Sequence, residues 1–281
     1  MITKASPAKV NLYLRVLGRR EDGYHDILSL MKKISLCDEM TFAPMPGGIV
    51  IRCPDSPLPE DEGNIVHRAA KAFFSRIAAP PDIEITIRKK IPIAAGLGGG
   101  SSNAATTLMT LNEISGSPLT REELLDMGGK LGADVPFFIF GSTAWASGIG
   151  DRFAEAAPLP RLWFVLINPG FAVPTKWAYQ NLNLELTNIQ IKYSIPRFYT
   201  VDALTRGLTN DLEKVTVRVH PVLEQIKSLL LESGAGGALM SGSGPTVFGL
   251  FGDEGSSLRA EKYLTQKIRE NRWSAFRAHS L

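Results

Sequence analysis

The sequence has little cysteine and histidine, no long apolar run and almost no excess of one charge, and each shortage excludes a class of protein. Cys37 and Cys53 are its two cysteines, and its four histidines do not recur at the spacing of zinc ligands. A disulfide framework and a zinc site are therefore excluded. No run approaches the ~18 apolar residues of a membrane-spanning helix. The net charge of +3 is too small for a nucleic-acid-binding surface, although it suits a small anionic substrate.

Size and composition predict an ordinary globular protein of two domains. A chain of 281 residues exceeds the usual ~100–200 residues of one domain. Its content of 44% hydrophobic and 21% charged residues is typical of a protein with an ample core. Pro158-Leu-Pro160 is the predicted seam between residues 1–157 and residues 158–281. The first residues contain neither an apolar signal core nor a Ser/Arg-rich transit segment, so we expect a cytoplasmic protein in a reducing compartment.

The most informative stretch is Pro92-Ile-Ala-Ala-Gly-Leu-Gly-Gly-Gly-Ser-Ser102. The alternating residues 82–88 before it predict a strand, and the apolar spacing after it predicts a helix that begins near Ser101. A strand, a glycine-rich turn and a helix place backbone N–H groups and the positive helix end against an anion. Ser101 and Ser102 would act as helix caps or as ligands of phosphate or its metal. We therefore favour a phosphate-binding loop over the alternative of a flexible connection without a ligand.

This loop matches neither of the two commoner glycine motifs. It lacks the Gly-Lys-Ser/Thr ending of a Walker A loop. It also lacks the third glycine of a dinucleotide fingerprint and the acidic residue that would follow about 20 positions later.

The pattern of Lys9-Val-Asn-Leu-Tyr-Leu-Arg-Val16 predicts a strand with Val10, Leu12, Leu14 and Val16 on one face. Lys9 and Asn11 lie together on the other face. On composition alone we expect that face to be exposed to solvent.

His25 and Asp134 each have a structural and a functional interpretation. His25 follows Tyr24 after a turn signal, and an isolated histidine of this kind is more often structural. Asp134 precedes the apolar run 135–140 and would either cap a helix that has a proline close inside it or line a pocket as a carboxylate that takes or orients a proton. The residues alone leave both alternatives open for Asp134.

The rest of the chain contains further predicted helices and strands. Helices are expected over 64–74, from the capping box Thr120-Arg-Glu-Glu123 towards Leu131, and over 222–230 and 254–269. Strands are expected over 162–167 and 273–278. The second glycine-rich stretch, Gly234 to Thr246, predicts either a β-hairpin with a wide turn or a second oxygen-binding loop. No element is predicted over 183–200.

Together these segments resemble the GHMP small-molecule kinases. The resemblance rests on the loop Pro92–Ser102 and on Met240-Ser-Gly-Ser-Gly-Pro245, and three further segments narrow it: Pro7 to Leu12, Gly18 to His25 and Leu131 to Phe137. It implies the α+β fold class and a two-domain GHMP kinase fold, with an N-terminal ribosomal-protein-S5-domain-2-like domain and a C-terminal ferredoxin-like domain. The active site would lie in the cleft between them.

The resemblance also implies roles for individual residues. Lys9 and Asp134 match the catalytic pair. Tyr24 and Tyr179 would hold a cytosine between their rings. Stacking tolerates any base, so discrimination needs a group that reads the edge of the base, and His25 is the nearest candidate. The ATP-binding residues would be Pro92, Ile93, Ala94, Ala95, Gly96, Leu97, Gly98, Gly99, Gly100, Ser101, Ser102, Asn64 and Lys89. The substrate-binding residues would be Asn11, Tyr24, His25, Tyr179, Gly242, Ser243 and Gly244.

The activity implied is phosphorylation of a small molecule, cytidine diphosphate-linked methylerythritol, with ATP and Mg²⁺ as cofactors. The direct ligand of Mg²⁺ stays open, because Ser101 or Ser102 would serve or ATP and water would hold the ion. No nucleic acid, membrane or obligate protein partner is expected. The alternatives are a GHMP kinase for homoserine, mevalonate or a sugar, or an RNA-binding protein; the Gly23-Tyr-His25 segment and the near-neutral charge disfavour them.

Overall fold

The computed structural model describes residues 1–182 and 195–281. The chain forms two units, each assembled from separate stretches of sequence. Unit 1 comprises Met1–Ala8, Cys37–Ile93 and Gly98–Ser142, and unit 2 comprises Lys9–Leu36, Ala94–Leu97 and the described part of Thr143–Leu281. The division at 157/158 rests on the sequence and on the family resemblance, and it stays a prediction.

Two long strands, β1 (Ile2–Arg19) and β2 (His25–Pro44), contribute to both units, because the chain passes from one unit to the other within each of them. The strand predicted over Lys9–Val16 is therefore confirmed, but it begins seven residues earlier, at Ile2.

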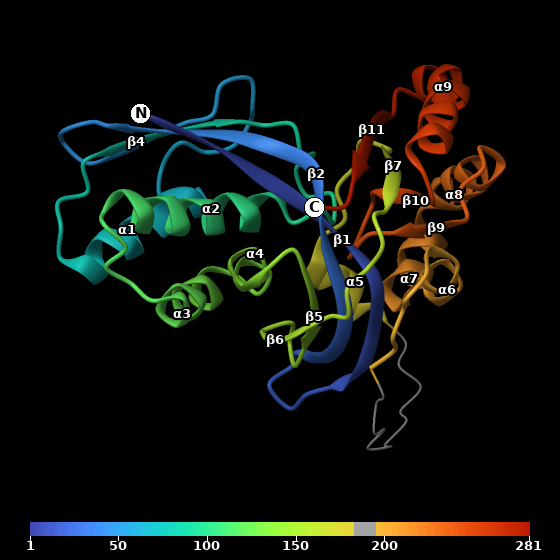
Figure 1. Cartoon of the computed structure of the whole chain (residues 1–281), viewed down its shortest axis with the longest axis horizontal. Helices are drawn as coiled ribbons and strands as arrows, with labels where there is room; N and C mark the ends of the chain where they lie inside the picture. Colours follow the sequence, from blue (N-terminus) through green and yellow to red (C-terminus); the bar gives the residue numbers. More distant parts are fainter. Residues whose placement is uncertain (183–194) are drawn as a thin grey trace. The chain divides into compact units, whose positions relative to one another are not determined.

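Unit 1 is a layer of strands covered by helices. Its remaining elements are β3 (Ile49–Arg52), α1 (Ile65–Ile77), β4 (Ile83–Arg88), α2 (Gly99–Ile114), α3 (Arg121–Leu131) and α4 (Val135–Phe140). The strand β4 pairs antiparallel with the second half of β2 and parallel with β3. Figure 1 shows α1, α2, α3 and α4 on the same side of these strands.

The helix α2 is buried along most of its length, which explains its small and apolar residues. Ala104, Ala105 and Leu108 are fully buried, and α2 packs against α1, where Ala69 and Ala70 are also buried. Small side chains at facing positions allow two helices to approach closely and remove apolar area from water. The glycine-rich loop therefore ends at a rigid, deeply packed element.

Unit 2 contains a second sheet with the connectivity of a ferredoxin-like fold. Its elements after β2 are β5 (Thr143–Ser147), β6 (Arg152–Glu155), β7 (Trp163–Asn168), α5 (Thr175–Gln180), α6 (Val201–Gly207), β8 (Thr209–Asn210), α7 (Asp211–Val219), α8 (Val222–Glu232), β9 (Gly237–Met240), β10 (Val247–Phe251), α9 (Glu254–Asn271) and β11 (Ser274–His279). The strands follow the order β11-β7-β10-β9, and every neighbouring pair is antiparallel. With α8 before β9 and α9 before β11, this order confirms the ferredoxin-like prediction.

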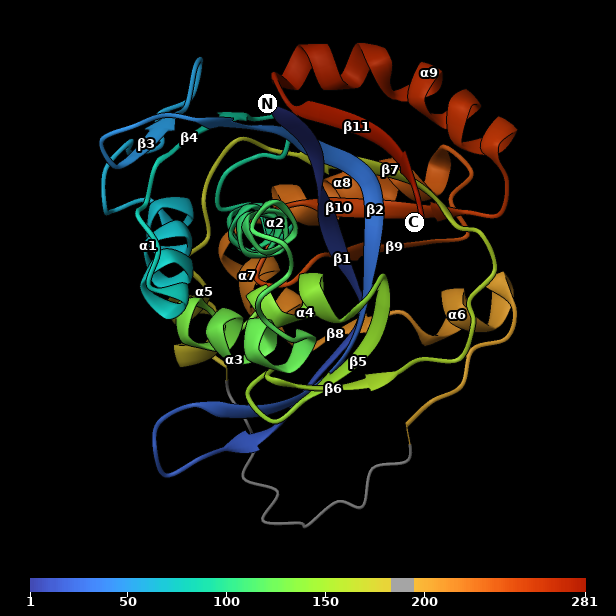
Figure 2. The ribbon, with the colours of Figure 1, turned by 60° about the vertical axis from the view of Figure 1, so that its left-hand side comes forward.

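The helices α8 and α9 pack on one face of this sheet (Figure 2). Leu230 of α8 and Leu264 of α9 belong to one core cluster with Val165 of β7 and Phe251 of β10. The first half of β2 pairs with β5, and β1 pairs in parallel with β8. All of these contacts lie inside unit 2.

Most predicted elements are present, including the capping box at Thr120, which opens α3. The helices α6 and α7 were not predicted, because each is short, with seven and nine residues. No element was predicted over 183–200. Residues 183–194 of this stretch lie outside the described part of the chain. No helix within 1–182 and 195–281 is both long and apolar enough to cross a membrane.

Candidate active site

The loop between β4 and α2 has the backbone conformation of an anion-binding turn. Ala94, Gly96 and Gly98 have positive φ angles of 52°, 76° and 69°. The helix begins at Gly99, and Gly98 caps it without a side-chain bond. The first N–H groups of a helix have no acceptor inside the helix, so they are available to an anion. The helix starts two residues before the predicted Ser101, and the interpretation of Ser101 and Ser102 as its caps is wrong.

The two serines differ in their surroundings. The hydroxyl of Ser102 is buried and lies 2.8 Å from the hydroxyl of Ser6. Ser101 is half-buried at the first turn of α2. Of the two hydroxyls, that of Ser101 is therefore the better placed for a ligand.

A close backbone approach makes glycine necessary at position 96. A Cβ atom there would overlap the carbonyl oxygen of Ser241 and lie 3.0 Å from the amide nitrogen of Gly244. Both partners are backbone atoms, which cannot move aside as a side chain can. The two glycine-rich stretches of the sequence thus meet at this point in unit 2.

Lys9 and Asn11 are 3% and 4% exposed, so the prediction that their strand face is exposed to solvent is wrong. The ammonium of Lys9 donates to Oδ1 of Asn11 at 2.7 Å and to the carbonyl oxygen of Gly96 at 3.1 Å. Because Asn11 donates from Nδ2 to the hydroxyl of Ser29 at 2.8 Å, its carbonyl oxygen must face Lys9. A buried charge is tolerated only where such bonds replace water.

Ser29 and Ser241 were not singled out as site residues, although both support this arrangement. The hydroxyl of Ser241 donates to the carbonyl oxygen of Gly96 at 3.0 Å, and the backbone nitrogen of Asn11 donates to that hydroxyl at 3.3 Å. The hydroxyl of Ser29 in turn donates a hydrogen bond to the carbonyl oxygen of Tyr13. Ser241 directly precedes Gly242 in the second glycine-rich stretch, which was a usable signal, whereas nothing distinguished Ser29 within an apolar strand.

The second glycine-rich stretch forms a β-hairpin, as one of its two interpretations predicted. Met240 of β9 pairs with Val247 of β10, and the turn lies between them. The side chain of Asn210 donates to the carbonyl oxygens of Met240 and Gly242, both at 2.7 Å. Ser243 lies 3.0 Å from the hydroxyl of Thr175. The turn is thus held on both sides, and substrate binding by Gly242, Ser243 and Gly244 stays a prediction.

Three aromatic residues of unit 2 were predicted to bind a base. The rings of His25 and Tyr179 are stacked, with centroids 5.2 Å apart and planes inclined by 26°. Tyr24 is 62% exposed. Burial lowers the pKa of His25, and the nearby charge of Arg19 lowers it further. His25 is therefore predominantly neutral at pH 7, and one ring nitrogen can accept a hydrogen bond.

Asp134 lies in unit 1, directly before α4. It occupies the N-cap position, with Pro136 close inside the helix, but its side chain makes no capping bond. Its interpretation as a side-chain cap is therefore wrong, and the interpretation as a functional carboxylate stays a prediction.

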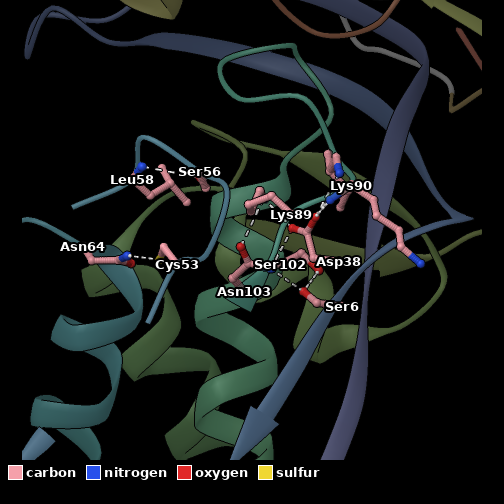
Figure 3. Close-up of polar contacts among 11 residues, drawn as sticks. Ser6, Asp38, Cys53, Ser56, Leu58, Asn64, Lys89, Lys90, Ser102 and Asn103 are labelled. Carbon is pink, nitrogen blue, oxygen red and sulfur yellow. Dashed lines mark hydrogen bonds and ion pairs between the residues drawn. The ribbon is translucent and has the colours of Figure 1, made fainter. Parts of the chain in front are cut away.

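Asn64 and Lys89, predicted to bind ATP, both have structural partners in unit 1 (Figure 3). Asn64 caps α1 by accepting from the backbone nitrogen of Val66 at 2.9 Å, and it donates to the carbonyl oxygen of Pro59 at 2.7 Å. Lys89 forms an ion pair with Asp38. Their roles in ATP binding remain predictions.

Among the residues that the structure describes, no group of three or more histidine, cysteine, aspartate or glutamate side chains could hold a metal ion. An ion that enters with a nucleotide and keeps most of its water would not need such a group.

The fold and the loop are those of a known class. The description "GHMP kinases N terminal domain" matches residues 64–142, and "GHMP kinases C terminal" matches residues 200–270. The chain therefore has both halves of a GHMP kinase.

Its relatives narrow the class to one enzyme. Proteins named 4-diphosphocytidyl-2-C-methyl-D-erythritol kinase from Syntrophus aciditrophicus (strain SB) and Syntrophotalea carbinolica (strain DSM 2380 / NBRC 103641 / GraBd1) are 54% and 49% identical, and the matches cover 100% and 96% of both chains. The crystal structure of a 4-(cytidine 5'-diphospho)-2C-methyl-D-erythritol kinase is 33% identical, with a TM-score of 0.83 over 99% of each chain. The chain belongs to the 4-diphosphocytidyl-2-C-methyl-D-erythritol kinases.

A homoserine kinase from Cytophaga hutchinsonii ATCC 33406 shares the fold, with a TM-score of 0.74 at 19% identity over 100% of this chain and 94% of that chain. At that identity the likeness concerns the fold alone.

The resemblance to the GHMP kinases that the sequence motifs indicated is confirmed by the family matches and the relatives.

Proposed function

We propose that this kinase transfers the γ-phosphoryl group of ATP to the 2-hydroxyl of 4-diphosphocytidyl-2-C-methyl-D-erythritol, in the non-mevalonate (MEP) route to isoprenoid precursors. The observation that carries the proposal is the loop 92–102, with its left-handed residues and its junction with a buried helix, in a chain of this family. ATP is the phosphoryl donor, as in the GHMP kinases generally. A cytoplasmic location is part of the proposal, and the two free cysteines agree with a reducing compartment.

The loop and Lys9 supply the positive character that phosphoryl transfer requires. The reaction depends mainly on positioning and on neutralising charge, while the bond to the acceptor oxygen forms and the bond to the ADP oxygen breaks. Backbone N–H groups at the start of α2 would bind phosphate oxygens. Asn11 and the carbonyl oxygen of Gly96 fix the ammonium of Lys9 in unit 2.

Asp134 would receive or orient the proton of the acceptor hydroxyl. Its carboxylate is half-buried and is not used to cap α4. Proton transfer by a positioned carboxylate typically contributes roughly 10²–10⁴-fold to a rate. Whether Asp134 takes the proton or only orients it, the negative form of the carboxylate is the active one.

The residues around the loop fit a magnesium ion that is bound mainly by the nucleotide. When bound, Mg²⁺ would supply positive charge that neutralises the phosphate groups during transfer. Ser101 offers a hydroxyl oxygen at the first turn of α2, and oxygen is the ligand atom that Mg²⁺ prefers. Ser102 is less suited because its hydroxyl is buried against Ser6.

The acceptor's cytosine would stack on Tyr24 and Tyr179, with His25 accepting a hydrogen bond from its exocyclic amine. Stacking of a base on an aromatic ring is worth ~1–3 kcal/mol but tolerates any base. A group that reads the edge of the base is needed for discrimination. The neutral ring of His25, stacked beside Tyr179, suits this role.

The test is a panel of acceptors with ATP. We expect efficient transfer to 4-diphosphocytidyl-2-C-methyl-D-erythritol, and a kcat/KM for the uridine analogue lower by roughly tenfold to a hundredfold, because an unpaired buried polar group costs ~1–3 kcal/mol. Homoserine and mevalonate should not react. Efficient phosphorylation of either would overturn the proposal, and equal use of both pyrimidines would overturn the role of His25.

A further inference from the structure

Asp38, in the second half of β2, is buried beneath the start of the phosphate-binding loop. Its carboxylate is 0% exposed and accepts four hydrogen bonds (Figure 3). Oδ1 accepts from the backbone nitrogens of Lys90 at 2.8 Å and Ile91 at 2.9 Å. Oδ2 accepts from Nδ2 of Asn103 at 3.0 Å and from the ammonium of Lys89. One carboxylate thus binds both the chain that enters the loop and the helix that leaves it.

The ammonium of Lys89 lies at the first turn of α2. A Cβ atom on Gly99, the first residue of that helix, would be 3.2 Å from Nζ of Lys89. The side chain of Lys89 is 10% exposed, and Nζ also donates to Oδ1 of Asn103 at 3.3 Å. Within the described residues, Asp38 and Asn103 take two of the three N–H donors of the ammonium, and one donor is left for a ligand.

Asn103 forms hydrogen bonds to both Lys89 and Asp38, and a second set of bonds fixes its side chain. Its Nδ2 also donates to the hydroxyl of Ser6 at 2.9 Å, and that hydroxyl is 2.8 Å from the hydroxyl of Ser102. The amide therefore has a single orientation, with its oxygen towards Lys89 and its nitrogen towards Asp38.

Stability alone is a weak reason to bury this pair. Taking two charges out of water is costly, and well-packed apolar residues of similar volume are often as stable or more so. A buried lysine held at the phosphate end of a helix has a use that an apolar residue lacks, because its position is set before ATP arrives and no side-chain entropy is lost on binding.

We propose that Asp38 is a positioning residue for ATP binding, which acts by holding the ammonium of Lys89 at the first turn of α2. The proposal rests on the proposed function in taking ATP as the nucleotide, and on the prediction that Lys89 binds it. Asp38 is not among the site residues predicted from the sequence. We expect it to affect the affinity for ATP and not the affinity for the acceptor.

The test is a double-mutant cycle of Asp38→Asn, Lys89→Met and their combination. Asparagine at position 38 keeps an oxygen for the two backbone N–H groups but loses the negative charge that holds Lys89. We expect each single variant to raise KM for ATP roughly tenfold to a hundredfold, as for the loss of a charged hydrogen bond. The value of kcat and the KM for the acceptor should change by less than about threefold, and the double variant should be no worse than Lys89→Met.

Two controls separate positioning from folding. Lys32→Met removes another buried lysine, which donates to the hydroxyl of Thr143 at 2.6 Å in unit 2. It should leave KM for ATP unchanged. Asn103→Ala removes one contact of each charge and should raise KM for ATP by a smaller factor, which keeps the proposal testable if Asp38→Asn fails to fold.

An unchanged KM for ATP in a folded Asp38→Asn or Asn103→Ala variant would overturn the proposal, even if Tm fell. Losses that add in the double variant would also overturn it, because Asp38 would then not act through Lys89. Titration calorimetry with a non-hydrolysable ATP analogue measures the same affinities without an acceptor. It therefore tests Asp38 even if the acceptor assignment is wrong.

Discussion

At the scale of single residues, this kinase uses polar side chains that are removed from water and held by neighbours. Lys9 donates to Asn11 and to the backbone of Gly96, and Asn11 is itself fixed by Ser29. Such a chain leaves each group one orientation, which is what a phosphoryl-transfer site needs. Asp134 and His25 allow this view to be tested one side chain at a time.

For Asp134→Asn we expect kcat to fall by roughly 10²–10⁴-fold, with KM for ATP and Tm close to those of the unmodified kinase. The substitution keeps the shape of the side chain and removes the basic oxygen. Steady-state kinetics and thermal denaturation are the measurements.

Asp253→Asn is the matched control, because Asp253 does cap a helix. Its carboxylate accepts from the backbone nitrogen of Ser256 at 2.8 Å at the start of α9. This variant should keep its kcat, and any change should appear in Tm. A folded Asp134→Asn kinase with normal kcat would show that Asp134 has no part in the reaction.

The protonation of His25 should make kcat/KM for the cytidyl acceptor depend on pH. Burial and Arg19 lower its pKa below the ordinary value of 6.5, so protonation at lower pH removes the acceptor nitrogen. We expect kcat/KM for the cytidyl acceptor to fall as the pH drops through this lowered pKa, with KM for ATP unaffected. The unfolded chain binds the proton more readily, so His25 also lowers stability as the pH falls below about 6.5.

Arg19→Gln is the informative control for this pH profile. Removing the positive charge should move the acidic limb to higher pH, because one of the two causes of the lowered pKa is gone. His25→Ala should remove the limb. A limb that stays in place in both variants would belong to another group.

At the scale of elements, two glycine-rich turns depend on one another. The loop between β4 and α2 and the turn of the β9–β10 hairpin approach so closely that Gly96 has no room for a Cβ atom beside Ser241. Asn210 holds the hairpin turn from the other side. The two turns should therefore move together when either is disturbed.

For Gly96→Ala we expect a markedly lower Tm and a loss of kcat/KM of at least about a hundredfold. The left-handed φ of 76° costs an alanine ~1 kcal/mol or more, and displacement of Ser241 and Gly244 adds to that. Gly100→Ala is the control, because its Cβ would meet only Ile65, at 3.8 Å. Gly100→Ala should keep its Tm, and an equal loss in both variants would contradict the steric argument.

At the scale of the whole molecule, neither unit is a continuous piece of the chain. Unit 2 takes the first half of β2 and most of β1, and its core cluster joins Leu14, Val16 and Ile27 to residues after 160 such as Val173 and Leu212. A cut at the predicted seam would therefore divide a hydrophobic core.

We expect a fragment of residues 1–157 to lack a cooperative thermal transition and to bind the dye ANS, because the apolar residues of β1 and β2 lose their partners. Co-expression with residues 158–281 should restore a folded complex. Circular dichroism, ANS fluorescence and calorimetry measure this. A fragment 1–157 that unfolds cooperatively on its own would show that the seam separates independent domains.

The sequence by itself determined most of the elements and the class of this protein. Alternation and helical spacing depend only on local geometry, so β1, β4, α1, α3 and α9 could be predicted from the residues. The glycine spacing of 96 to 100 indicated a phosphate-binding loop because only glycine permits a close backbone approach. The motif order then identified the GHMP kinases, which the relatives confirm.

Only the tertiary structure decided which side chains are buried and what they contact. Lys9 and Asn11 look like solvated strand residues because alternation says nothing about what covers the second face of a strand. The burial of Asp38 and its bonds to residues 51 to 65 positions later depend on a fold that no local pattern contains. Helix capping cannot be inferred from position alone either, because Asp134 occupies an N-cap position and yet its side chain makes no capping bond. Long-range contacts are set by packing, so the partner of a polar group follows from the whole fold rather than from its own stretch of sequence.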